Sequence, residues 1–171
     1  MTASISDEVL KNWAPSGAVD CIMDSKEMKK MVTTQQWRGL HIQDFEGKGR
    51  GVIVTRRFEA GEVVCDYHGD VITFAEGQKV HKATTEKETG YMFFFKDQKG
   101  RSMCIDAHSE TCDCHPGMQT FGRLINHSKK RANVKPRYFS VDMGGEQRDV
   151  ILFIASRTLL VNEEVLSLWS E

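Results

Sequence analysis

The segment Arg123-Leu124-Ile125-Asn126-His127-Ser128 carries the most informative pattern in this chain. The residues before its polar triplet, 122–125, predict one helical turn. Taken alone, Asn-His-Ser is an ordinary polar turn, because Asn and Ser side chains readily bond to nearby backbone. The segment gains weight from further motifs, which stand on both sides of it along the chain.

Four further motifs accompany this segment. In order along the chain they are Gly49-Arg50-Gly51-Val52, Gly61-Glu62-Val63-Val64, Tyr67-His68-Gly69-Asp70-Val71-Ile72 and Glu163-Glu164-Val165-Leu166. The glycine-rich turn 47–51 is not a nucleotide loop, because it has no Gly-Lys-Ser/Thr ending and no helix follows it. Glycine suits either a small cofactor lying against the turn or a tight hairpin with positive φ. Both interpretations stay open.

This ordered set of motifs resembles the SET-domain protein lysine methyltransferases. It is most similar to the subfamily that places one methyl group on a histone H4 tail lysine, and the similarity covers about residues 26–166. The resemblance implies a mainly β fold of several small curved sheets with short helices. It also implies a C-terminal pseudoknot, in which the last segment passes beneath a loop near Asn126 to Asn133. The implied cofactor is S-adenosyl-L-methionine, the implied partner a histone H4 tail or nucleosome, and the implied location the nucleus, on chromatin.

The resemblance also assigns roles to individual residues. It implies a catalytic role for Tyr67, near the lysine channel, and cofactor binding by Lys48, Gly49, Arg50, Tyr91, Asn126 and His127. Where the family has Tyr-x-Tyr-Gly, this chain has Trp169 in place of the catalytic tyrosine, and indole lacks a hydroxyl oxygen. The flanking segment expected after the domain does not follow Glu171. Two functions therefore stay open: an active histone lysine methyltransferase, and a catalytically impaired paralogue or truncated product that binds histone or chromatin.

Two charged regions bear on partners. A basic histone tail is expected to meet acids such as Asp66, Asp70 or Asp106. Five basic residues lie within nine positions without an acid: Lys129, Lys130, Arg131, Lys135 and Arg137. A solvated loop is the simpler explanation, and weak DNA contact through residues 129–131 is the alternative, because a nucleosomal substrate places phosphates nearby.

Composition limits the remaining possibilities. The 171 residues are 40% hydrophobic and 27% charged, which fits one compact domain. The formal net charge of −1 gives no overall attraction to nucleic acid or anionic membrane. Neither a membrane span nor a signal peptide is recognisable, so we expect an intracellular monomer with reduced thiols and no membrane contact. Cys112, Cys114 and His115 lack the second ligand pair of a zinc site, so we predict a polar loop and no metal.

Hydrophobic periodicity predicts short strands with frequent turns. We expect an N-terminal tail over 1–23, a flanking helix within 24–38 and a SET domain over 39–171. The predicted strands are 40–42, 52–54, 63–67, 91–95, 103–105, 138–142 and 149–155. The last run does not alternate, which predicts burial on both faces. A short helix is predicted over 74–88, and Phe93, Phe94 and Phe95 are predicted to lie in the core.

Overall fold

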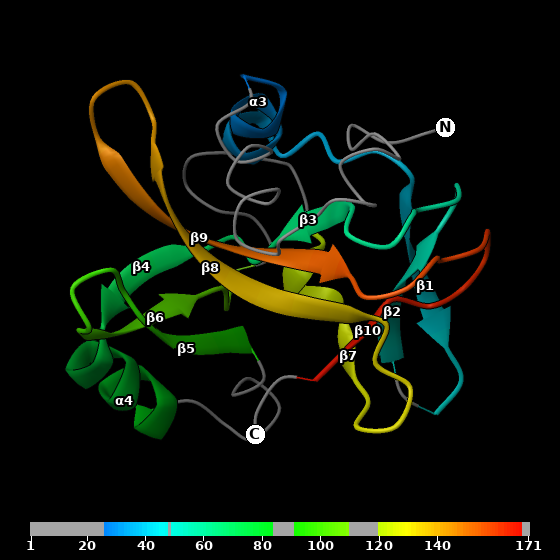
Figure 1. The fold of residues 1–171 in the computed structure, drawn as a ribbon. Coiled ribbons are helices and arrows are strands. Elements are labelled where there is room, and N and C mark those ends of the chain that lie inside the picture. The colour runs from blue at the N-terminus through cyan, green and yellow to red at the C-terminus, as the bar shows by residue number, and fades with distance from the viewer. Residues whose placement is uncertain (1–25, 48, 84–90, 110–119, 169–171) are drawn as a thin grey trace.

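Three sheets organise the protein in a computed structural model, which describes residues 26–47, 49–83, 91–109 and 120–168 (Figure 1). The first sheet pairs β1 (Leu40–Phe45) with β2 (Gly49–Val54). The second has the order β4 (Asp70–Thr73), β6 (Ser102–Asp106), β5 (Met92–Lys96). The third has the order β3 (Val63–Asp66), β9 (Gln147–Ala155), β8 (Val134–Asp142), β10 (Leu166–Ser167), β7 (Asn126–His127). The mainly β fold expected from the sequence is confirmed.

The hairpin of β8 and β9 forms the centre of the molecule, and it crosses between α3 (Lys26–Thr34) and the β4–β6–β5 sheet in Figure 1. Residues 150–155 of β9 are all buried, as the absence of alternation predicted. They join one hydrophobic cluster with residues from β2, β3, β8 and α3. The core therefore contacts both faces of β9.

The flanking helix α3 docks on this core through Met28 and Val32, as its periodicity predicted. It ends at Thr34 because Gln35 adopts a positive φ of 58°, and the Gln35 N–H donates to the Met31 carbonyl oxygen at 2.8 Å. Helix α4 (Phe74–Ala83) lies within the range 74–88 predicted for it. The helical turn predicted before Asn126 is a 3-10 turn, η2 (Gly122–Leu124).

The C-terminal strand β10 lies between β7 and β8, two strands that precede it in the chain. It runs parallel to both, with Leu166 opposite Asn126 and Ser167 opposite His127. Asn133 closes the arrangement: its N–H donates to the Leu166 carbonyl oxygen, and its side-chain oxygen accepts from the Leu166 N–H. This insertion under the 128–133 loop is the expected pseudoknot.

Two sequence predictions were wrong in detail. Phe94 does not lie in the core: it is 38% exposed and packs on Phe74, with ring centroids 5.5 Å apart. Successive side chains of β5 point to opposite faces of an edge strand, so only Phe93 and Phe95 pack against the core. The glycine-rich turn is also shorter than expected, because β2 begins at Gly49, paired with Phe45.

Candidate active site

The polar segment of β7 is fixed by two other parts of the chain. The Asn126 side-chain Nδ2 donates to the Arg50 carbonyl oxygen at 3.1 Å and to the Glu164 carboxylate at 2.9 Å. Gly51 permits this approach, since a Cβ there would lie within 2.8 Å of both Glu164 Oε2 and Asn126 Nδ2. Three expected motifs, from β2, β7 and the segment before β10, therefore meet at one point.

Gly49 lies at the open edge of this cluster. Its φ of +78° is one that L side chains rarely adopt, and a Cβ there would meet nothing within 4 Å. The positive φ explains the glycine as a hairpin residue, while the open space leaves its backbone accessible to a ligand. Both interpretations of this glycine therefore fit the geometry. Lys48, which precedes it, lies outside the described residues.

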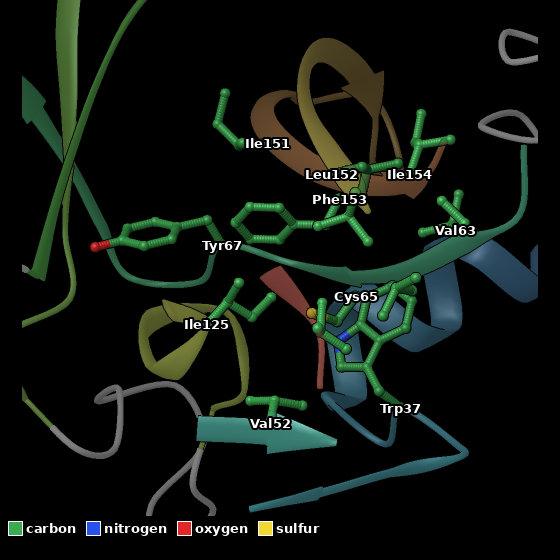
Figure 2. Packing of buried hydrophobic residues seen from close by; sticks show 14 of the residues in the cluster. Trp37, Val52, Val63, Cys65, Tyr67, Ile125, Ile151, Leu152, Phe153 and Ile154 are labelled. Carbon is green, nitrogen blue, oxygen red and sulfur yellow. The ribbon is translucent and has the colours of Figure 1, made fainter. Parts of the chain in front are cut away.

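Tyr67 follows β3 and is 2% exposed. Its ring lies between Phe93 and Phe153, at centroid distances of 5.5 Å and 6.4 Å, and Figure 2 shows its hydroxyl pointing away from Phe153. Burial, helped by Cys104 and opposed by Arg123, raises the pKa of Tyr67 well above its ordinary value. The phenol therefore stays protonated at neutral pH and can orient a partner rather than act as a base.

The turn η2 connects this tyrosine with the β7 cluster. A Cβ on Gly122 would lie 2.2 Å from the Asp66 carbonyl oxygen and 2.9 Å from the Tyr67 Cα, so only glycine allows the turn to approach so closely. Ile125 caps the C-terminal end of the same turn, and Asn126 is the next residue. The candidate lysine-channel residue and the candidate cofactor residue therefore lie on two sides of one short turn.

Arg123, a residue of the same turn, contacts Tyr91. The Arg123 guanidinium carbon lies 3.9 Å from the Tyr91 ring centroid, a cation–π contact, while Arg123 Nε donates to the Ala107 carbonyl oxygen at 2.7 Å. Nearby, His108 Nδ1 hydrogen-bonds to the Asp106 carboxylate, and the His108 ring contacts Tyr91 edge to face. Tyr91 is thus half-buried and ordered, with one face covered by an arginine of the chain itself.

Asp66 is the centre of a buried polar network. Its carboxylate accepts from Gln35 Nε2 at 3.0 Å and 3.1 Å, from Trp37 Nε1 at 3.1 Å and from His68 Nδ1 at 3.0 Å. The side chain is only 3% exposed. It therefore attaches the segment after α3 to the strand that presents Tyr67. Asp66 also lines the pocket beside Tyr67, so its contact with a histone tail stays a prediction.

This pocket beside Tyr67 is open, has a volume of about 300 Å³ and carries more accessible acids than Asp66. Asp70 and Asp149 line it together with Arg148 and the buried His68. Asp149 accepts a hydrogen bond from the Tyr138 hydroxyl at 2.6 Å, which fixes its position. Asp106, the third expected acid, is half-buried and engaged by His108.

Several other predictions concern thiols, metals and membranes. Cys65 and Cys104 are buried free thiols, as expected, and burial raises the pKa of Cys104 to about 12. Within the ranges that the structure describes, no group of three or more His, Cys, Asp or Glu residues could hold a metal, and no helix is long and apolar enough to cross a membrane. The segment with Cys112, Cys114 and His115 lies outside those ranges, as does Trp169.

The structure brings Gly49, Arg50 and Asn126 together, and it places Tyr67 and Tyr91 around η2. His127 is exposed in β7, next to this cluster in sequence. Sequence reasoning gave no role to Arg123 or Glu164, although both stand inside quoted motifs. A charged residue followed directly by two apolar ones, as in Arg123-Leu124-Ile125 and Glu164-Val165-Leu166, was the available signal that Arg123 is buried and Glu164 partly buried.

This combination of small sheets, a pseudoknot and a polar loop at its centre defines the SET class of folds. The sequence matches the SET domain family over residues 49–167, so the chain belongs to that family. N-lysine methyltransferase KMT5A of Xenopus tropicalis is 34% identical over 146 residues, which are 84% of this chain and 39% of the relative. Histone-lysine N-methyltransferase Set8 of Drosophila melanogaster is 38% identical over 104 residues, 60% of this chain and 14% of the relative.

Solved structures give the same result. CpSET8 from Cryptosporidium has a TM-score of 0.67 and 26% identity, with coverage of 86% of this chain and 67% of that one. The Neurospora SET domain protein DIM-5, a histone lysine methyltransferase, has a TM-score of 0.62 at 22% identity, covering 86% and 58%, and shares the fold. The chain spans about two fifths of the length of the Xenopus relative.

Proposed function

We propose that this chain is an S-adenosyl-L-methionine-dependent protein lysine N-methyltransferase that adds one methyl group to a histone H4 tail lysine. The observation that carries the proposal is the position of η2, with Tyr67 packed against one end and Asn126 following the other. The names of the relatives, N-lysine and histone-lysine methyltransferases, support the same activity. The nuclear location and the monomeric state belong to this proposal.

The residues present fit the cofactor. The backbone at Gly49 is open to a ligand, and the Ser167 hydroxyl oxygen, buried opposite His127, has no hydrogen-bond partner among the described residues. A buried polar atom of this kind calls for a polar group that the described part of the chain does not supply. Lys48, Gly49, Arg50, Tyr91, Asn126 and His127 are the residues proposed to hold S-adenosyl-L-methionine, which supplies an activated methyl group when bound.

The protein's own contribution is orientation and electrostatics. An attacking lysine must be a neutral amine, although its ordinary pKa is about 10.4. The aromatic surroundings of Tyr67 exclude water, and low polarity disfavours the charged ammonium form. The protonated Tyr67 hydroxyl can then hold the amine by a hydrogen bond, which limits the orientations it samples. Trp169, in the position of the second tyrosine, is proposed to close the same site.

The expected substrate is basic, and the surface beside Tyr67 suits it. Asp70 is exposed, and Asp149 is fixed by Tyr138 at the mouth of the same pocket. Carboxylates in this position attract a lysine-rich tail and disfavour acidic peptides. In a nucleosome, weak contact of Lys129, Lys130 and Arg131 with DNA forms part of the same proposal.

The test combines calorimetry with S-adenosyl-L-methionine and methyl transfer to a histone H4 tail peptide and to nucleosomes. Tyr67→Phe removes the proposed orienting hydroxyl, and Thr33→Val is the control, since it removes a hydroxyl that bonds to the Lys29 carbonyl oxygen on the exposed side of α3. We expect cofactor binding in all three proteins and a loss of transfer rate of roughly 10²-fold or more in Tyr67→Phe alone. Equal rates in both variants would contradict the role of Tyr67.

Two other outcomes separate the alternatives. Tight binding of cofactor and tail without measurable transfer by the parent protein would favour the histone-binding module over the enzyme. Absence of cofactor binding in a folded parent protein would contradict the proposed cofactor site itself.

A further inference from the structure

We infer that the basic loop and the adjacent face of β8 together form a binding surface for the phosphate backbone of duplex DNA. The surface consists of Lys129, Lys130, Arg131, Lys135 and Arg137, and we call it the β8 basic surface. It extends beyond the loop to the sheet, and it binds DNA independently of cofactor, histone tail and methyl transfer.

The first support is the absence of acids beside these cations in the ranges that the structure describes, whereas four other arginines of the domain are paired with carboxylates. Ion pairs with carboxylates are made by Arg56, Arg57, Arg101 and Arg157, whose partners are Glu62, Glu59, Asp97 and Glu163. No residue of the β8 basic surface has a carboxylate partner among the described residues, and the segment 129–137 contains no acid. Within the described part of the chain, whose full sequence has a net charge of −1, these five positive charges therefore have no ion-pair partner.

The second support is the rigid base of the loop. The Ser128 N–H donates to the Ser167 carbonyl oxygen at 3.1 Å, and the Asn133 N–H donates to the Leu166 carbonyl oxygen at 2.8 Å. Between these anchors, the Arg131 N–H donates to Ser128 Oγ at 2.9 Å and closes the turn. Because the pseudoknot strand holds both ends, the backbone that carries the loop cations is already ordered before a ligand binds.

The third support is the continuation onto β8. Lys135 and Arg137 stand two positions apart on the strand, so both point to the same face, with Cα atoms about 6.8 Å apart. One DNA strand carries one phosphate per about 3.4 Å of helix axis, so two cations at this spacing can reach phosphates of the same strand. Both residues also line an open hollow of about 400 Å³, with Ala60, Gly61, Ala155 and Ser156 on its other sides. None of the described residues that line this hollow is acidic, which favours an anionic partner.

The experiment measures binding of a fluorescent duplex of about 20 base pairs, two turns of B-DNA, as a function of salt concentration. The strand variant is Lys135→Gln/Arg137→Gln, and the loop variant is Lys129→Gln/Lys130→Gln/Arg131→Gln. The control, Lys79→Gln/Lys82→Gln, removes the same charge as the strand variant from exposed positions on α4, which lies at the opposite end of the molecule in Figure 1.

If all five cations contact phosphates, the slope of log K against log salt is roughly −4.5, and the strand variant lowers its magnitude by about 1.8. We expect the control to keep the parent slope. A strand variant that binds as the parent does would overturn the inference, as would an equal loss in the control. Displacement of the duplex by polyglutamate at equal charge concentration would assign the surface to acidic proteins and also overturn it.

Discussion

Replacement of Asp66 by alanine is expected to destabilise the protein severely, because the Asp66 carboxylate is the shared acceptor of a buried network. Trp37 Nε1 and His68 Nδ1 both point at this carboxylate in the structure. Gln35 Nε2 also bonds to it, yet keeps a second acceptor in the Val32 carbonyl oxygen at 2.9 Å. Asp66→Ala thus takes the acceptor from two buried donors and leaves Gln35 partly satisfied.

The size of the effect follows from that count. A buried donor without its partner costs about 1–3 kcal/mol, so two donors give a loss of roughly 2–6 kcal/mol. The free energy of unfolding of a domain is about 5–15 kcal/mol in total, so the variant is expected to lose a large share of its stability. Trp37→Phe removes one of these donors, so no acceptor is needed at that position. It is therefore expected to lower the free energy of unfolding less in the Asp66→Ala variant than in the parent protein.

Urea unfolding of the parent, both single variants and the double variant gives the coupling energy directly. We expect the double variant to lose about 1–3 kcal/mol less stability than the sum of the two single variants, because this is the cost of one buried donor without an acceptor. Costs that add within about 0.5 kcal/mol would refute the hydrogen bond between Trp37 and Asp66. A loss below about 1 kcal/mol for Asp66→Ala would refute the network as a whole.

Three further predictions concern the candidate cofactor loop and the response to alkaline pH. Asn126→Ala is expected to abolish measurable cofactor binding in calorimetry, since it removes bonds to both Arg50 and Glu164; unchanged affinity in a folded variant would contradict the cofactor assignment. Gly49→Val and Gly47→Val place the same side chain at similar φ values in open space, so similar falls in Tm are expected for the two variants. Cofactor affinity is expected to fall only in Gly49→Val. Equal losses of affinity in both variants would show that the turn is a simple hairpin. Burial and the bond to Asp149 raise the pKa of Tyr138 to about 12 from an ordinary 10, so its contribution to stability is complete below about pH 10 and is lost as pH rises to 12. Tyr138→Phe should therefore flatten the fall of the urea midpoint over that range, and an unchanged profile would count against the shifted pKa.

Local patterns were sufficient to predict β9 and the face of α3, but they gave only the second half of β8 and missed β4. The apolar run 150–155 predicted its own burial, and Met28 with Val32 predicted the docking face of the helix. The strands β7 and β10 were not predicted, because two residues have no periodicity. Their state depends on pairing between Asn126 and Leu166, distant positions in the sequence.

The candidate site was predictable only where a motif carried it. Asn126 and Gly49 were named from the family resemblance, and the structure places them in one cluster with Arg50. The buried network of Asp66 could not be predicted, because its partners Trp37 and Gln35 lie 29 and 31 residues away in the sequence. No local pattern reports an acceptor shared over such separations.

The insertion of β10 between β7 and β8 also sets the order of events during biosynthesis. Asn126 leaves the ribosome 38 residues before its partner Glu164. β8 ends at Asp142 and β10 begins at Leu166, 24 residues later, so at about 5–20 residues per second roughly 1–5 s pass in which β7 and β8 have both emerged and the strand that joins them has not. Throughout that interval the nascent chain exposes two unpaired strand edges, so it is most open to aggregation, and to chaperone binding, just before the pseudoknot closes.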